Sequence, residues 1–245
     1  MTRDPEQDGG WTESAKAWID VIDRGDPNRL LLLDPVMLQL AGEVARLLVL
    51  DVGCGEGRFC RLLSEAGARC TGLDVSTPLV QAARSRSGLN DSYVVGAGGS
   101  LPFDDATFDL VVSYVSLIDI PDFRSAIAEF ARVLRPEGRL LVSNIGFVSA
   151  AEHGWARDEQ GRRLYQRIDR YADGWSYTAE WSGIRIINYH RPLSAYMEAY
   201  LRAGLILGSF QEPVPSDQSL RADDYYEDWF RVPLFNVMLW EKPAL

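Results

Sequence analysis

The stretch Asp51-Val52-Gly53-Cys54-Gly55-Glu56-Gly57 decides the fold of this chain of 245 residues. It directly follows the apolar run Leu47–Leu50 and precedes a segment with helical spacing. An apolar run, a glycine-rich turn and a helical segment predict a strand–loop–helix unit. Because glycine has no Cβ and tolerates positive φ, such a loop lets backbone approach a ligand closely. The stretch therefore predicts a ligand site at the end of a strand.

The spacing of the glycines separates two kinds of ligand. A dinucleotide-binding loop has the pattern G-x-G-x-x-G, but here the third glycine is Gly57 and Arg58 stands at the last position of that pattern. The carboxylate of Asp51, which opens the loop, would repel a phosphate group. The loop therefore favours a ligand that carries a positive charge.

At these residues the chain resembles the class I S-adenosylmethionine-dependent methyltransferases, and within them the small-molecule branch called methyltransferase type 11. Their first motif is an acidic residue followed by x-G-x-G-x-G, which Asp51 to Gly57 match at every fixed position. The resemblance covers residues 35–145, and 190–243 in pattern. It implies S-adenosyl-L-methionine as cofactor and a Rossmann-like, doubly wound α/β fold. The expected sheet has seven mostly parallel strands with an antiparallel last strand, plus a helical and aromatic cap.

The alternation of strand-like and helix-like segments supports this architecture. We expect helices over 12–24, 35–46, 57–66, 77–86, 122–134 and 193–203. We expect strands over 47–51, 69–74, 92–96, 110–115, 139–144, 205–211 and 234–241, with an acidic helical insert near 220–229. Four parts follow: an N-terminal helical cap segment (1–34, with a loose tail over 1–10), the cofactor-binding core (35–145), a substrate-side cap insertion (146–190) and a C-terminal helix with the final strand hairpin (191–245).

The composition limits the partners. A net charge of −10 with 47% hydrophobic residues disfavours a polyanion, so no nucleic acid partner is expected. A local basic patch stays open, although a solvated helix face is the favoured explanation for its members: Arg157, Arg162, Arg163, Arg167 and Arg170. Three cysteines without C-x-x-C spacing (Cys54, Cys60 and Cys70) predict reduced thiols of a cytoplasmic protein and no metal site. We expect neither a signal peptide nor a membrane span, and the oligomeric state stays open.

The resemblance assigns one end of the cofactor to the glycine loop. The residues expected beside its amino-acid end are Asp51, Gly53, Cys54, Gly55 and Gly57. A helix-capping role for Asp51 stays open. Trp18 and Arg29 are expected to help close the site over the cofactor.

Residues at and after the following predicted strands are expected to bind the ribose and the adenine of the cofactor. Asp74 ends the second predicted strand, where a carboxylate accepts hydrogen bonds from the ribose hydroxyls; a simple turn role stays open. Val75 is expected to pack on the adenine. Many relatives carry an adenine-contacting aspartate where this chain has Ala97, which removes one hydrogen bond, on the order of 1 kcal/mol. The backbone N–H of Gly98 is expected to reach the adenine ring instead.

Methyl transfer needs alignment of nucleophile and methyl group, and sometimes removal of a proton. By resemblance, Tyr114 flanks the transferable methyl group and contacts the cofactor or the substrate, although an ordinary half-buried tyrosine stays open. His190 is the favoured general base, with a structural role equally open, and His153 is a weaker candidate. The cap is rich in aromatic residues: Trp155, Tyr165, Tyr171, Trp175, Tyr177 and Trp181. They suit a flat or hydrophobic substrate, or form a small core of the cap itself. An aromatic box for a cationic substrate stays open as a less favoured alternative.

The expected function is transfer of a methyl group from S-adenosylmethionine to O, N or C of a small aromatic or hydrophobic molecule. A nicotinamide-dependent oxidoreductase is the first alternative, disfavoured by the glycine spacing and by the absence of an evident Ser-Tyr-Lys set. A non-catalytic S-adenosylmethionine-binding module is the second, left open by Ala97 and by the lack of a certain base.

Overall fold

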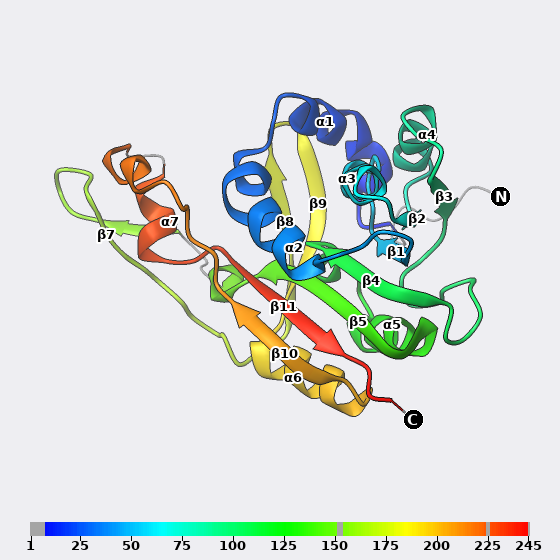
Figure 1. The fold of residues 1–245 in the computed structure, drawn as a ribbon. Helices are drawn as coiled ribbons and strands as arrows, with labels where there is room; N and C mark the ends of the chain where they lie inside the picture. Colours follow the sequence, from blue (N-terminus) through cyan, green and yellow to red (C-terminus); the bar gives the residue numbers. More distant parts are fainter. Residues whose placement is uncertain (1–7, 151–153, 224–225, 245) are drawn as a thin grey trace.

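The computed structural model describes residues 8–150, 154–223 and 226–244. The expected tail over 1–10 and the position of His153 therefore lie wholly or partly outside the described residues. Figure 1 shows one central sheet with helices on both of its sides.

The central sheet has seven strands in the order β10-β11-β5-β4-β1-β2-β3. Their bounds are β1 (Leu48–Val52), β2 (Arg69–Asp74), β3 (Asp91–Val95), β4 (Phe108–Tyr114), β5 (Leu134–Ile145), β10 (Ile206–Gln211) and β11 (Phe235–Glu241). Strands β3, β2, β1, β4 and β5 pair in parallel, whereas β11 runs antiparallel to both β5 and β10. The prediction of a doubly wound, mostly parallel sheet with an antiparallel last strand is confirmed.

Alternating residues of the central strands pack into two separate hydrophobic cores, one on each face of the sheet. Val49 and Val112 pack with the residues on one face, and Leu50 and Val111 pack with those on the other. Successive side chains of a strand point to opposite faces, so a sheet covered on both sides needs apolar residues at nearly every position. This explains the unbroken apolar run that precedes Asp51.

Helices α1 to α4 lie on one side of the sheet, and α5 and α6 on the other (Figure 1). Their bounds are α1 (Trp11–Asp23), α2 (Asp34–Ala41), α3 (Arg58–Glu65), α4 (Thr77–Ser85), α5 (Phe123–Val133) and α6 (Leu193–Arg202). The expected helix over 35–46 is shorter than predicted, because Gly42 adopts φ 65° directly after Ala41. A π-helix, η2 (Asn28–Leu33), leads into α2 and was not expected.

The insertion after β5 is built of β-hairpins, so the helix face expected for its charged residues is wrong, whereas the expected N-terminal cap segment contains the helix α1. After the short helix η4 (Phe147–Ala150), strands β6 (Trp155–Arg157) and β7 (Arg163–Gln166) form one hairpin. Strands β8 (Trp175–Trp181) and β9 (Ile184–His190) form a second. The charged residues assigned to a helix face lie on and around the first hairpin, whose turn is fixed by Asp158 accepting the backbone N–H of Arg162 at 2.8 Å.

The acidic insert near the C-terminus is helical within its described part. It contains η5 (Gln218–Ala222) and α7 (Glu227–Arg231), while residues 224–225 lie outside the described ranges. The β6–β7 hairpin and α7 lie together away from the central sheet (Figure 1). Arg231 joins them by donating to the carbonyl oxygen of Leu164 at 2.8 Å.

The N-terminal helix packs against the second hairpin, although the two segments are far apart in the sequence. The N–H of Ile187 donates to the carbonyl of Gly9 at 2.8 Å, and the hydroxyl of Ser14 donates to the carbonyl of Arg185 at 3.0 Å. Gly10 fits because a Cβ there would lie 2.6 Å from the Arg185 oxygen. This contact encloses the space above the carboxyl ends of the central strands.

Candidate functional site

A cavity of about 790 Å³ lies where β1, β2 and β4 end. Its walls come from the glycine loop, from α1 and the residues after it, from the segment that follows β4, and from the β8–β9 hairpin. Ligand crevices of open α/β sheets form at the carboxyl ends of the strands. The volume lies in the upper part of the range for small-molecule sites, roughly 300–1,000 Å³.

The cavity brings together nearly all the residues that the sequence assigned to the cofactor. Those that line it are Trp18, Arg29, Asp51, Gly53, Cys54, Gly55, Asp74, Val75, Gly98 and Tyr114. Ala97 also lines it, so a methyl group stands where many relatives were expected to carry a carboxylate.

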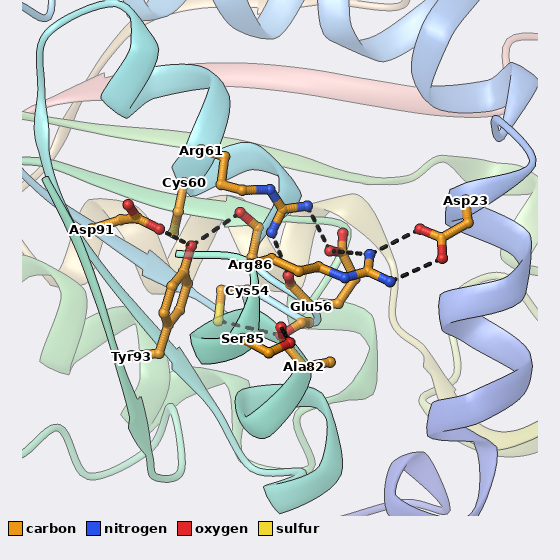
Figure 2. A network of polar contacts seen from close by, with 12 residues as sticks. Asp23, Cys54, Glu56, Cys60, Arg61, Ala82, Ser85, Arg86, Asp91 and Tyr93 are labelled. Atoms are coloured by element: carbon orange, nitrogen blue, oxygen red, sulfur yellow. Dashed lines mark hydrogen bonds and ion pairs between the residues drawn. The ribbon is translucent and has the colours of Figure 1, made fainter. Parts of the chain in front are cut away.

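Gly57 is the exception, because it does not line the cavity. It precedes α3 with φ 81°, and a Cβ there would lie 2.5 Å from the Tyr93 hydroxyl oxygen. That hydroxyl donates to the carboxylate of Asp91 at 2.6 Å (Figure 2). Gly57 therefore lets the loop pack against β3, and its contact with the cofactor stays a prediction.

Asp74 connects the glycine loop to the residue that precedes α4. Its Oδ2 accepts the N–H of Gly55 at 2.8 Å, and its Oδ1 accepts the N–H of Ser76 at 2.8 Å. Burial raises the pKa of this carboxyl to about 6. Each carboxylate oxygen can accept more than one hydrogen bond, so the group holds the loop in place and retains acceptor capacity.

Asp51 is buried, with 1% of its surface exposed. The thiol of Cys60 donates to its Oδ2 at 3.6 Å, whereas Oδ1 has no hydrogen-bond partner in the described part of the chain. Burial raises the pKa of this carboxyl to about 7. An unpartnered carboxylate oxygen at a cavity wall fits a cationic donor such as an ammonium group.

Arg29 is one of the two cationic residues that line the cavity, and its charge acts on Asp51. Its guanidinium lies 4.4 Å from the ring centroid of Tyr114 and 5.0 Å from that of Trp18. Its Nε lies 3.6 Å from a carboxylate oxygen of Asp26 but makes no hydrogen bond. Arg29 is therefore held between two aromatic rings and keeps a donor for an anionic group.

The hydroxyl of Tyr114 is already engaged. It donates to Oδ1 of Asp34 at 2.8 Å, and Asp34 forms an ion pair with Arg58. Burial raises the pKa of the Tyr114 hydroxyl above its ordinary value. The ring of Tyr114 is thus fixed at the cavity wall, and its hydroxyl is poorly suited to remove a proton.

His190 lies outside the cavity lining and is fully buried. Its Nδ1 lies 2.9 Å from the Ser149 hydroxyl, and its Nε2 lies 2.9 Å from the carbonyl oxygen of Tyr171. A carbonyl only accepts, so Nε2 carries the hydrogen, while Nδ1 lies within hydrogen-bond distance of the Ser149 hydroxyl, which also donates to the Gly146 carbonyl at 2.9 Å. Because both nitrogens are occupied, the proposed role as general base is not supported, and the histidine stabilises the cap.

Two site features escaped the sequence analysis. Asp119 lines the cavity at the end of η3 (Leu117–Asp119), and burial raises the pKa of its carboxyl to about 8. It accepts the indole N–H of Trp11 at 3.2 Å and a hydrogen bond from the amide of Asn188. An acidic residue shortly after the fourth strand was a signal that could have revealed it.

Glu56, inside the glycine loop, is the second missed feature. Its side chain is 2% exposed and accepts from Arg61 at 2.6 Å and from Arg86 at 3.1 Å (Figure 2). Arg86 also pairs with Asp23 of α1. This network ties the glycine loop to the N-terminal helix.

Comparisons with known proteins agree with this geometry. Residues 50–142 match the family model described as "Methyltransferase domain". The chain is 33% identical over 132 residues (54% of this chain, 49% of the relative) to a malonyl-[acyl-carrier protein] O-methyltransferase of Salmonella typhimurium. It is 37% identical over 95 residues (38% of this chain, 40% of the relative) to a demethylmenaquinone methyltransferase of Tropheryma whipplei. The chain thus spans about half or less of the length of these curated relatives.

Solved structures are similar over a longer stretch. An S-adenosylmethionine-dependent methyltransferase from Mesorhizobium loti shares 27% identity with a TM-score of 0.77, covering 85% of this chain and 96% of that one. A putative S-adenosylmethionine-dependent methyltransferase from Listeria monocytogenes has the same fold, with 24% identity, a TM-score of 0.77 and coverage of 86% and 96%.

A glycine loop and two acids at adjacent strand ends of a doubly wound sheet define a Rossmann-like ligand-binding protein. Residues 50–142 match a methyltransferase domain, and the chain is similar over most of its length to a solved S-adenosylmethionine-dependent methyltransferase. Within the described ranges, no helix combines the length and hydropathy that a membrane crossing requires.

Proposed function

We propose that this chain transfers the methyl group of S-adenosyl-L-methionine to a small, largely apolar acceptor. The observation that carries the proposal is one cavity with two different ends. One end holds the glycine loop with Asp51 and Asp74, and the other is walled by aromatic and aliphatic residues of the β8–β9 hairpin.

The acidic end suits the amino-acid part of the cofactor, which carries one ammonium and one carboxylate. The unpartnered Oδ1 of Asp51 is the acceptor for the ammonium group. Arg29, with its free Nε, is the donor for the carboxylate. Gly55 lets Trp18 of α1 approach the loop, because a Cβ at Gly55 would lie 3.1 Å from the indole nitrogen.

The nucleoside part of the cofactor fits the ends of β2 and β3. Asp74 retains acceptor capacity for ribose hydroxyls while it orders Gly55 and Ser76. Val75 and Leu79 line the same wall and offer apolar contacts to an adenine ring. The chain carries Ala97 here, so recognition of the adenine depends on backbone groups such as the N–H of Gly98.

The acceptor fits the far end of the cavity. Tyr177, Trp181 and Ile186 of the hairpin line it, together with Ile145 and Phe235 from the ends of β5 and β11. Such a wall favours a flat or aliphatic body. The names of the two curated relatives refer to different acceptors, malonyl-acyl-carrier protein and demethylmenaquinone, so the relatives do not select one.

S-adenosyl-L-methionine supplies a methyl carbon that its positive sulfur activates for attack. The protein's own contribution is positional: Asp51, Arg29 and Asp74 would fix the cofactor. Residues of helix α1 and of the β8–β9 hairpin line the cavity and shield part of it from solvent. The engaged hydroxyl of Tyr114 keeps its ring, a wall of the same space, in one orientation.

Methyl-labelled S-adenosylmethionine tests the proposal. Purified protein is incubated with the labelled cofactor and fractions of a small-molecule extract, and we expect label in an apolar fraction. Asp74→Ala should abolish the transfer, whereas Asp173→Ala, at a carboxylate with a 62% exposed side chain, should not. Tight cofactor binding with no transfer to any fraction would favour the non-catalytic module, and binding of NADH in calorimetry would favour the oxidoreductase.

A further inference from the structure

Asp119 is a buried carboxyl group at the meeting point of three elements. It ends η3 and accepts hydrogen bonds from Trp11 of α1 at 3.2 Å and from Asn188 of β9. Both donors are neutral, and no ion pair to Asp119 occurs among the described residues. Asp119 and Asn188 both line the cavity, as does Tyr177, which pairs with Asn188 across the hairpin.

The cavity as a whole is acidic. Its acidic lining residues are Asp8, Asp26, Asp51, Glu56, Asp74, Asp119 and Asp122, and its cationic ones are Arg29 and Arg58. Arg58 is hydrogen-bonded to Asp34, whereas Arg29 has only a longer ion pair with Asp26, at 3.6 Å, and is the less engaged of the two cations. If Arg29 holds the carboxylate of the cofactor, the lining offers no further cation to an anionic acceptor.

The environment of Asp119 supplies two neutral hydrogen-bond donors but no ion-pair partner among the described residues. Arg191 is the nearby cation, but its guanidinium donates to the backbone carbonyls of Leu117, Ile120 and Pro121. Burial raises the pKa of Asp119 to about 8, and the charge of Asp74 adds to this effect. A positively charged group in the cavity would stabilise the ionised form of Asp119.

We propose that Asp119 selects an amine, so that the acceptor is a small aromatic or aliphatic molecule whose nitrogen is held by this carboxyl group and then methylated. This inference rests on the proposed function and names its substrate class. Trp11 and Trp18, whose rings lie 5.4 Å apart at the same cavity, add aromatic faces that attract a cation.

In the proposed reaction Asp119 accepts a proton from the ammonium group of the acceptor. An alkylammonium gives one N–H proton to the Asp119 carboxylate, which frees the nitrogen lone pair. That lone pair forms the N–CH₃ bond while the S–CH₃ bond breaks and its electron pair stays on sulfur. The product nitrogen carries the positive charge as a methylammonium, the sulfur becomes a neutral thioether, and Asp119 releases its proton to solvent.

Binding to matched probes tests the selection without turnover. The protein is saturated with S-adenosylhomocysteine, and calorimetry compares an amine, an alcohol and a carboxylate on each of three bodies: phenylethyl, indolylethyl and octyl. On the body that binds best, we expect the amine to bind about tenfold more tightly than the other two, because it adds a charge-assisted hydrogen bond. No binding, equal binding or preference for the carboxylate overturns the proposal.

Variants locate the effect at Asp119. Asp119→Asn should remove the preference for the amine and leave the affinity for S-adenosylhomocysteine unchanged, whereas Asp173→Asn, which changes the net charge equally, should keep the preference. If Asp119→Asn instead weakens S-adenosylhomocysteine binding and the amine preference survives, Asp119 belongs to the cofactor site and the proposal fails.

Labelled S-adenosylmethionine separates this inference from the proposed function. Label in the amine supports both. Label in an alcohol or acid but not in the amine overturns the amine proposal and leaves the proposed function standing. No label in any acceptor counts against the proposed function, while the binding comparison still decides whether Asp119 selects amines.

Discussion

The guanidinium of Arg86 donates to both carboxylate oxygens of Asp23, 63 residues away in the sequence, at 2.8 and 2.9 Å. The same guanidinium reaches the buried carboxylate of Glu56 in the glycine loop (Figure 2). A single side chain thus fixes the end of α1 to the loop that carries the predicted cofactor contacts.

Replacing Arg86 by alanine should loosen both elements. We expect Arg86→Ala to lower the free energy of unfolding by about 1–3 kcal/mol, because Glu56 stays buried with one partner fewer. It should also weaken binding of S-adenosylhomocysteine, because α1 carries Trp18. Urea unfolding and calorimetry measure these effects. Arg202→Ala removes an exposed pair with Glu198 and should cost less than about 1 kcal/mol; equal costs would contradict a special role for Arg86.

Gly57→Ala separates a steric clash from backbone strain. Gly57 and Gly161 have nearly the same φ, 81° and 80°, but a Cβ at Gly161 meets nothing within 4 Å. We expect Gly161→Ala to cost about 1 kcal/mol from strain alone, and Gly57→Ala to cost roughly 1–3 kcal/mol more from overpacking against Tyr93. Thermal and urea unfolding of both variants provide the comparison. Equal destabilisation would mean that β3 yields to the new methyl group.

The unliganded protein should lose stability as the pH rises from about 5 to about 8. Burial raises the pKa values of Asp51, Asp74 and Asp119 from 3.8 to about 7, 6 and 8. In this range the native state binds more protons than the unfolded state, so its advantage is complete below the unfolded pKa and is lost as each native pKa is passed. The lowered pKa values of Asp122 and Glu129 act at lower pH.

Urea unfolding across this pH range checks the slope. Asp51→Asn should flatten it, because one of the three raised groups no longer titrates. S-adenosylmethionine should also flatten it, because its ammonium stabilises the ionised Asp51. A stability that rises with pH between about 5 and 8 would show that these carboxyl groups are ionised in the free protein.

His190→Ala should unfold the cap more readily without acting on the chemistry. Loss of a fully buried ring with hydrogen bonds to Ser149 and Tyr171 should cost about 2–4 kcal/mol. The affinity for S-adenosylhomocysteine should stay unchanged, since the ring lies outside the cavity lining. A variant of normal stability that has lost turnover would restore His190 as the base.

The core could be predicted because its signals are local. The apolar run before Asp51 and the glycines after it are consecutive, and Asp74 ends the next strand, so each prediction depended on one short segment. The bounds of β2 agree with the prediction at both ends. Because parallel strands end at the same edge of the sheet, the residues that follow β1 and those that end β2 lie close together there.

The cap and the acceptor side could not be predicted in this way. The residues over 155–190 carry aromatic and charged side chains without a clear period, and the turn at Asp158 decides for a hairpin. Asp119 owes its environment to Trp11 and Asn188, which lie 108 and 69 residues away. His190 was the favoured base because it is one of two histidines and precedes the helix at 193, but its burial depends on pairing across the β8–β9 hairpin.

The contact between α1 and β9 joins a segment that is synthesised early to one that is synthesised late. A ribosome releases the glycine loop, Asp74 and Asp119 well before Asn188, and chains grow at roughly 5–20 residues per second. For several seconds the nascent chain would contain the residues predicted to bind the cofactor but not the β8–β9 hairpin. During this time α1 would lack the hairpin against which it packs, and the cavity would be open on that side. Enclosure of the cavity is therefore a late event, one that the arrival of β8 and β9 would trigger.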